Sequence, residues 1–286
     1  MKKILIVTAF IPFLVAGVFA GGQQDGGGNS DSIRLSMGGS TTMEPIMSSA
    51  MEIYRTEVDS NAELSYDAQG STMGIQGVLN GICDLGGASR ALLPSETEQG
   101  VQATQVAVDG LAVVVNDSVP IDDLSIEQVA AIFVGEIRNW SRLGGPDEEI
   151  VVVNRDEASG TLGAFRFIVL ETTYGDDARF TRNALVTESD GNMATMVSQT
   201  PYAIGYASMR TIPRLDQSGG KALTINGIEN NRENVMTGQY PITRSLNIVT
   251  YGEPRGDAVV FLDFLRSGRG QEIILDVGFL PIGMIR

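Results

Sequence analysis

The feature that most constrains the fold of this chain is an alternation of helix-like and strand-like segments from residue 32 onward. Residues 43–54 place apolar side chains at the i, i+3, i+4 and i+7 spacing of one helix face, whereas residues 62–68 alternate like a strand. Ser125 and Gln128 form a capping box that opens a helix ending at Gly135. This alternation predicts an α/β fold with mainly parallel sheets.

The remaining predicted elements continue the pattern. Further helices are expected at 71–79, 161–170, 192–199, 257–266 and 270–277. Further strands are expected at 84–89, 111–116, 151–154, 203–207, 222–226 and 248–251. Thr42 is the expected cap of the 43–54 helix, and Asp190 that of the 192–199 helix.

The first 31 residues differ from the rest in composition. Lys2 and Lys3 precede an apolar run that ends in Val18-Phe19-Ala20, which is typical of a secretory signal peptide over residues 1–20. An uncleaved membrane anchor is the alternative. The run is not followed by the cysteine that lipid attachment needs, so we expect a periplasmic protein. Residues 21–31 are rich in glycine and polar residues and predict a flexible tether.

Composition excludes several classes of function. Histidine is absent and Cys83 is the single cysteine, so His-based triads, His-ligated zinc and internal disulfides are excluded. The chain has 35 acidic and 20 basic residues and therefore lacks the basic footprint of a nucleic-acid binder. It also lacks a Walker loop, a GxGxxG fingerprint after a strand and a GxSxG elbow. We expect no metal, cofactor or catalytic residue.

Three glycine-, serine- and threonine-rich turns each precede a predicted helix, at 38–42, 70–74 and 158–161. A helix N-terminus offers unpaired N–H groups and a partial positive charge, and glycine lets an anion approach the backbone. Any one turn alone is most simply an ordinary cap. Together with Arg155 and Arg90, whose guanidinium groups match a tetrahedral oxyanion, they indicate an anion site. The pattern does not choose between phosphate and sulfate.

These segments resemble the periplasmic phosphate-binding proteins of phosphate ABC transporters, the PstS-type substrate-binding proteins. The shared segments are GGSTTMEP (38–45), QGSTMGIQGVLNG (69–81), DLGGASR (84–90), IFVGEIRNW (132–140), NRDEASGT (154–161) and AIGYAS (203–208). The match runs over nearly all of residues 33–286. It implies the two-lobed periplasmic binding protein fold, type II-like, with the ligand cleft between lobes. We expect Trp140 to pack in the core of the second lobe.

The resemblance also implies the site and the function. The ligand-binding residues it assigns are Ser40, Thr41, Thr42, Gly70, Ser71, Arg90, Arg155, Ser159, Gly160 and Thr161. It implies a monomer that binds phosphate and delivers it to an inner-membrane ABC permease, rather than an enzyme. A binding protein for sulfate, arsenate or molybdate, a phosphate sensor and a phosphatase are the alternatives. The expected lobes are 32–110 plus 246–286 and 111–245, with hinges near 108–112 and 243–248.

One position departs from part of this family. Some members hold an aspartate where this chain has Arg90, and that carboxylate accepts the proton of the phosphate dianion, which sulfate lacks. A site made only of donors loses this means of rejecting sulfate. Glu44, in the first turn of the first helix, is the candidate substitute acceptor, although a favourable charge near the helix dipole is the better explanation of this residue.

Overall fold

The computed structural model describes residues 32–284, which form one unit. The predicted signal peptide at 1–20 and tether at 21–31 lie outside the described residues. Within 32–284, no helix combines the length and the apolar character that crossing a bilayer requires.

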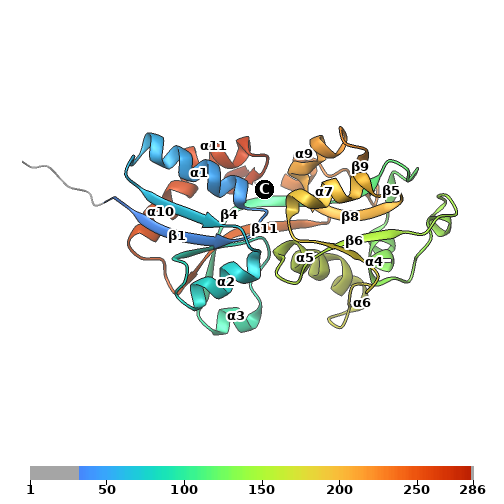
Figure 1. Ribbon diagram of the computed structural model, residues 1–286, viewed down its shortest axis with the longest axis horizontal. Helices are drawn as coiled ribbons and strands as arrows, with labels where there is room; N and C mark the ends of the chain where they lie inside the picture. Colours follow the sequence, from blue (N-terminus) through green and yellow to red (C-terminus); the bar gives the residue numbers. More distant parts are fainter. Residues whose placement is uncertain (1–31, 285–286) are drawn as a thin grey trace, which may run out of the picture. The chain divides into compact units, whose positions relative to one another are not determined.

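A mixed sheet connects two lobes, with the strand order β2-β1-β3-β11-β4-β8-β6-β7 and with β9 and β12 pairing to β4 (Figure 1). The strands of the first lobe are β1 (Arg34–Gly39), β2 (Glu63–Asp67), β3 (Leu85–Ala88) and β12 (Leu280–Pro281). Those of the second lobe are β6 (Val151–Arg155), β7 (Leu185–Thr187), β8 (Ala203–Ser208) and β9 (Gly220–Ala222). A separate pair joins β5 (Asp123–Leu124) to β10 (Thr224–Ile225).

Two long strands, β4 (Val101–Asn116) and β11 (Thr243–Tyr251), connect the lobes. From Val101 to Gly110, β4 pairs with β11, and from Leu111 onward it pairs with β8. Both pairings are antiparallel, whereas β1, β2 and β3 are parallel to one another, as are β6, β7 and β8. The prediction of mainly parallel sheets therefore applies within each lobe and is wrong for the connecting strands.

The first lobe buries apolar side chains on both faces of its sheet. Its helices are α1 (Glu44–Glu57), α2 (Ser71–Leu79), α3 (Pro94–Glu98), α10 (Asp257–Arg266) and α11 (Gly268–Asp276). One cluster includes Met47, Tyr54 and Phe261 from α1 and α10. A smaller cluster around Ile75 of α2 lies on the other face, so the sheet is shielded from water on both sides (Figure 1).

The second lobe has the same layering. Its helices are α4 (Ile126–Val134), α5 (Gly160–Phe165), α6 (Thr172–Tyr174), α7 (Asp190–Gln199), α8 (Ile212–Leu215) and α9 (Arg232–Met236). A π-helical turn lies at Arg166–Glu171, and short 3₁₀ turns lie at Trp140–Leu143 and Met209–Thr211. A further 3₁₀ turn, Ile282–Met284, follows β12 of the first lobe. Phe133, Phe165 and Tyr206 form an aromatic cluster in its core. Trp140 is fully buried in the same core and donates its indole N–H to the Tyr202 carbonyl, which confirms its packing role.

Of three predicted helix caps, the structure has one. The Ser125–Gln128 capping box is confirmed, since each side chain accepts a hydrogen bond from the backbone N–H of the other residue. The cap of α1 is Met43 rather than Thr42, and the cap of α7 is Ser189, which accepts from the Asn192 N–H, rather than Asp190. The Thr42 side chain instead contacts Thr161 of the second lobe, and the Asp190 side chain is buried.

Candidate anion-binding site

Two turns of the first lobe contribute to the site. The Ser40–Met43 turn follows β1 and leads into α1, and Gly70 precedes α2. The Gly70 N–H donates to the Gly39 carbonyl, and the Ser40 N–H donates to the Gly87 carbonyl, so the two turns are fixed to the same end of the sheet. Gly70 has φ near +103°, and a Cβ there would lie 2.6 Å from the Ala158 carbonyl oxygen of the second lobe. Only glycine suits that position.

The second lobe contributes the turn between β6 and α5. Ser159 caps α5, since its hydroxyl accepts from the Leu162 N–H. The first N–H groups of α5, at Gly160 and Thr161, have no partner within the helix and lie at this turn. Ser159 and Thr161 are both buried, although hydroxyl side chains usually lie at the surface.

Hydrogen bonds between the lobes bring these turns together. The hydroxyl oxygens of Thr42 and Thr161 lie 3.1 Å apart, and the Thr72 N–H donates to the Ala158 carbonyl. Ser71 lies against Gly160, where a Cβ would be only 2.1 Å from the Ser71 hydroxyl oxygen. The structure therefore assembles the three sequence-predicted turns in one place, in an arrangement with the lobes in contact.

Arg155 lies at the end of β6 with only 2% of its surface exposed. Its Nε donates to the Thr187 carbonyl, and its Nη2 donates to the Glu188 carbonyl and to the Thr41 hydroxyl. Nη1 is buried and has no hydrogen-bond partner among the described residues. Burial lowers the pKa of the guanidinium, and the Asp190 carboxylate opposes that shift. An arginine stays protonated in proteins, so a cationic N–H is held here without an acceptor.

Arg90 is placed differently from the other candidates. Its guanidinium forms a two-pronged ion pair with Glu96, at 2.7 and 2.8 Å, and both side chains are buried, with the stem of Arg90 against Gly163 of α5. Burial acts to raise the pKa of Glu96, but hydrogen bonds from Arg90 and from the Leu93 N–H outweigh it and lower that pKa. The charge of Arg90 is thus matched by Glu96, and its prediction as a phosphate ligand stays untested.

Sequence reasoning missed three buried charged residues beside the turns. Arg244 of β11 donates through Nε and Nη2 to Asp109 of β4, through Nη1 to the Thr161 hydroxyl and through Nη2 to the Thr42 hydroxyl. Asp190, at the start of α7, is 1% exposed. The available signal was a lone charged residue in an apolar run, as Asp109 is in VAVDGLAVVV. Glu44 is exposed.

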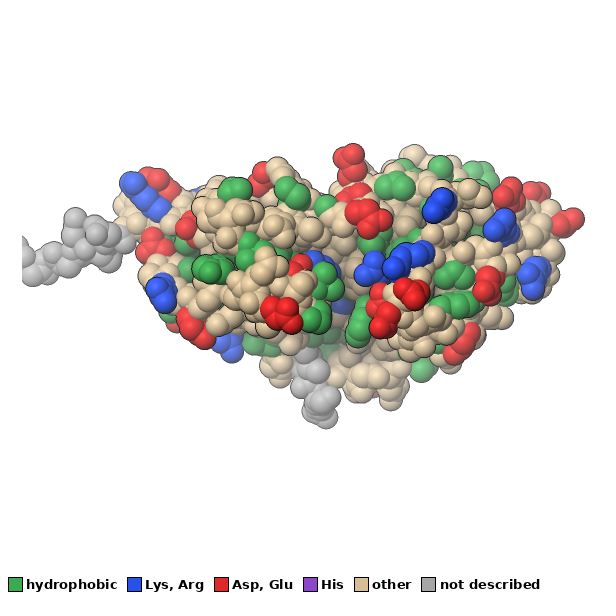
Figure 2. All heavy atoms as spheres, turned by 90° about the horizontal axis from the view of Figure 1, so that it is seen from below, with side chains coloured by type: hydrophobic (Ala, Val, Ile, Leu, Met, Phe, Trp, Pro, Cys, Tyr) green, Lys and Arg blue, Asp and Glu red, His purple; other side chains and the backbone are tan. Residues whose placement is uncertain are grey.

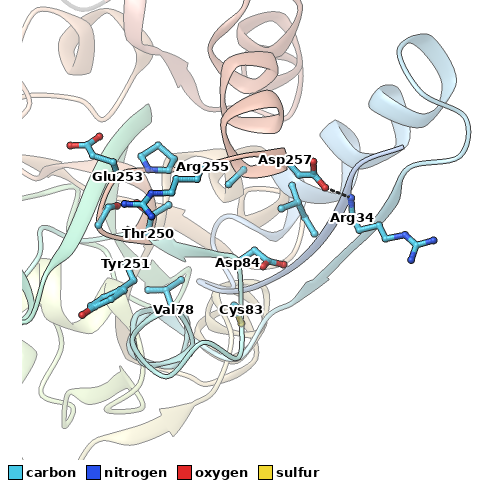
Figure 3. Close-up of a pocket in the computed structure, with 13 residues that line it drawn as sticks. Arg34, Val78, Cys83, Asp84, Thr250, Tyr251, Glu253, Arg255 and Asp257 are labelled. Carbon is cyan, nitrogen blue, oxygen red and sulfur yellow. Dashed lines mark hydrogen bonds between the residues drawn. The ribbon is translucent and has the colours of Figure 1, made fainter. Parts of the chain in front are cut away.

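A separate open pocket of about 410 Å³ lies on the first lobe (Figure 3). Its lining includes Arg34 and Arg255 but also Asp84, Glu253 and Asp257, and the Asp257 carboxylate accepts from the Arg34 backbone N–H. Charges of both signs line it and no residue of the three turns does, so it is not the predicted anion site. Among the residues that the structure describes, no three His, Cys, Asp or Glu side chains cluster to hold a metal.

Comparisons with known proteins identify the family of this chain. A family model described as "PBP superfamily domain" matches residues 22–269. The phosphate-binding protein PstS of Borreliella burgdorferi is 34% identical over 258 residues, covering 89% of this chain and 92% of that protein, and the PstS of Bacillus subtilis is 31% identical over 301 residues, covering 99% and 95%. A Clostridium perfringens structure, described as a phosphate ABC transporter substrate-binding protein with bound phosphate, has a TM-score of 0.80 at 30% identity and covers 88% of this chain and 100% of that one. This chain therefore belongs to the PBP superfamily and, within it, to the PstS family of phosphate-binding proteins.

Proposed function

We propose that this protein binds inorganic phosphate between its two lobes and delivers it to an ABC permease. The observation that carries the proposal is the buried Arg155, whose Nη1 has no acceptor among the described residues while hydroxyl-rich turns of both lobes lie beside it. A tetrahedral oxyanion supplies several acceptor oxygens at once, which is what such a set of donors requires. The relatives named above as phosphate-binding proteins support phosphate as that anion.

The proposed ligands are the three turns and Arg155. Thr41, Thr42 and Ser71 present hydroxyl and backbone N–H groups from the first lobe, and Ser159, Gly160 and Thr161 present theirs from the N-terminus of α5. Ser40 and Gly70 shape the turns. We leave Arg90 outside this proposed set because Glu96 already matches its charge.

Closure of the lobes around the anion is the proposed mechanism. The partner change of β4 between Gly110 and Leu111 supports a hinge there, and we keep 32–110 plus 246–286 and 111–245 as the proposed lobes. Phosphate would first contact the turns of one lobe, and the other lobe would then close and exclude water. In a low dielectric the same hydrogen bonds become stronger, which stabilises the closed form.

The overall negative charge does not oppose this proposal. The chain carries a net charge of −15, but charges beyond a Debye length of about 10 Å at 0.1 M salt are largely screened. Acidic and basic side chains are interspersed on the face shown in Figure 2. Arg155 and the helix N-termini act at contact distance, so they decide the interaction with the anion.

The proposed setting is the periplasm, with the protein acting as a monomer and without catalysis. The sequence resemblance to a secretory leader and the transport role named for the Clostridium perfringens structure support this setting. We propose no enzymatic activity, since the similar proteins are described as binding proteins rather than enzymes.

Calorimetry tests the proposal directly. We expect residues 32–286 to bind phosphate with one site per chain and to bind sulfate and molybdate much more weakly. Heats at the level of dilution for phosphate, together with saturable binding of another oxyanion, would contradict it. The same titration with arsenate, which has the shape and the protonation of phosphate, serves as a positive control.

A second prediction concerns closure. Gly160→Ala should weaken phosphate binding by about tenfold, because the added methyl group overlaps the Ser71 side chain only when the lobes are in contact. Gly160 has ordinary helical backbone angles, so alanine should not unfold α5. Gly268→Ala, where the Cβ meets open space at the start of α11, is the matched control. Equal affinities of the two variants in calorimetry would argue against closure at this contact.

A further inference from the structure

The strongest unexplained feature of the site is the carboxylate of Asp190. Only 1% of the residue is exposed, and neither carboxylate oxygen has a hydrogen-bond partner among the described residues. Ser189, rather than Asp190, caps α7, so the Asp190 side chain is free of the capping role. A buried carboxylate without partners is strongly unfavourable, which indicates that this one has a function.

Asp190 lies at the proposed phosphate site. Its backbone N–H donates to the Thr41 hydroxyl, which also accepts from Arg155 Nη2. The carbonyls that hold Arg155 belong to Thr187 and Glu188, just before Asp190 in the chain. The site therefore combines a cationic N–H and a carboxylate that are both buried and both without partners within residues 32–284.

The charged groups around Asp190 come from three strands. Arg155 of β6 is close enough for the Asp190 carboxylate to act on its pKa, and yet the two side chains form no ion pair. Asp109 of β4 is also within electrostatic range, and Arg244 of β11 already binds Asp109. Arg155, whose Nη1 also lacks a partner among the described residues, is therefore the cation that acts on Asp190, and it does so without a direct ion pair.

An ionised carboxylate has acceptors only, so it needs a ligand that carries a hydrogen. The phosphate dianion carries one O–H, whereas sulfate at neutral pH has none and would place a bare anionic oxygen against the carboxylate. We propose that Asp190 accepts a hydrogen bond from the O–H of bound hydrogen phosphate and thereby excludes sulfate. This role rests on the proposed function, and it replaces Glu44 as the candidate acceptor.

The test compares phosphate and sulfate in calorimetric titrations of the wild type, Asp190→Asn and Glu44→Gln. Asparagine keeps the size of the side chain but can turn its NH₂ group toward a sulfate oxygen. We expect the ratio of phosphate to sulfate affinity to fall about tenfold or more in Asp190→Asn. Glu44→Gln removes the same charge from an exposed position of α1 and should leave the ratio unchanged. An unchanged ratio in Asp190→Asn would overturn the proposal.

A second measurement needs no variant. Titrations of the wild type in buffers with different ionisation heats count the protons taken up on binding. Well above the second pKa of phosphate, we expect no net uptake, because the bound ligand already carries the shared hydrogen. Uptake of about one proton would mean that the bound complex holds a second hydrogen, so that an ionised Asp190 does not face the dianion, and would overturn the proposal. A wild type that binds no phosphate at all would overturn the proposed function and this role together, whereas phosphate binding with equal sulfate affinity would overturn this role alone.

Discussion

Replacing Arg155 by alanine should weaken phosphate binding by at least about 2 kcal/mol, or roughly 30-fold. The guanidinium is buried, its Nε and Nη2 are held by the carbonyls of Thr187 and Glu188, and its Nη1 is without a partner in the part of the chain that the structure describes. This orientation is fixed before the ligand arrives, so the charged hydrogen bonds form with little loss of side-chain entropy. Isothermal titration of purified variants with phosphate measures the change.

Two further variants separate charge from geometry. Arg155→Lys keeps the charge but loses the planar fork. We therefore expect its phosphate affinity to lie between that of the wild type and that of Arg155→Ala. Arg182→Ala removes an exposed arginine of the same lobe and should leave the affinity within about twofold, since an exposed charge acts through screened solvent. An affinity of Arg155→Ala equal to that of Arg182→Ala would refute the site assignment.

The local parts of the fold were predictable from the sequence. The capping box at Ser125 and the apolar periodicity of residues 257–266 predicted α4 and α10 at nearly their observed bounds. Such signals depend on neighbours in the chain. The three turns of the site were predictable for the same reason, because each combines glycine with hydroxyl residues before a helix.

The connecting strands were less predictable. The sequence indicated strands at 111–116 and 248–251, whereas β4 begins at Val101 and β11 at Thr243. The missed parts contain polar residues such as Gln102, Gln105 and Arg244, which break the apolar pattern. Arg244 is buried because it binds Asp109 across the strand pair, a contact between residues 135 positions apart. Tertiary contacts of this kind override a local pattern.

The roles of single polar residues were less predictable for a related reason. The DLGGASR segment predicted Arg90 as a ligand, which stays untested, and the ion pair of Arg90 with Glu96, six residues later, was not predicted. Thr42 and Asp190 have the chemistry of helix caps, and the structure gives the caps to Met43 and Ser189 instead. One residue type can serve as a cap or as a ligand, and only the packed fold distinguishes the two uses.

The buried ion pair beneath the site should have the largest effect on stability. Arg244→Ala is expected to lower the free energy of unfolding by about 3–5 kcal/mol, because it leaves the fully buried Asp109 carboxylate without its cation. The Ser208 hydroxyl and the Met209 N–H still donate to Asp109, but they are neutral donors. Urea unfolding of the ligand-free protein measures the loss.

The chain contains a matched control for this pair. Arg269 and Glu57 form an ion pair at the same N–O distance, 2.7 Å, but with side chains that are 41% and 46% exposed. Arg269→Ala should therefore change stability by no more than about 1 kcal/mol. The double variant Arg244→Met, Asp109→Leu should recover much of the stability that Arg244→Ala loses, since it removes both buried charges.

If Arg244→Ala lowered the free energy of unfolding no more than Arg269→Ala does, Arg244 could not be the cation that neutralises Asp109. Its hydrogen bonds to Thr42 and Thr161 would then be its main contribution, and the loss would appear in phosphate affinity instead of stability.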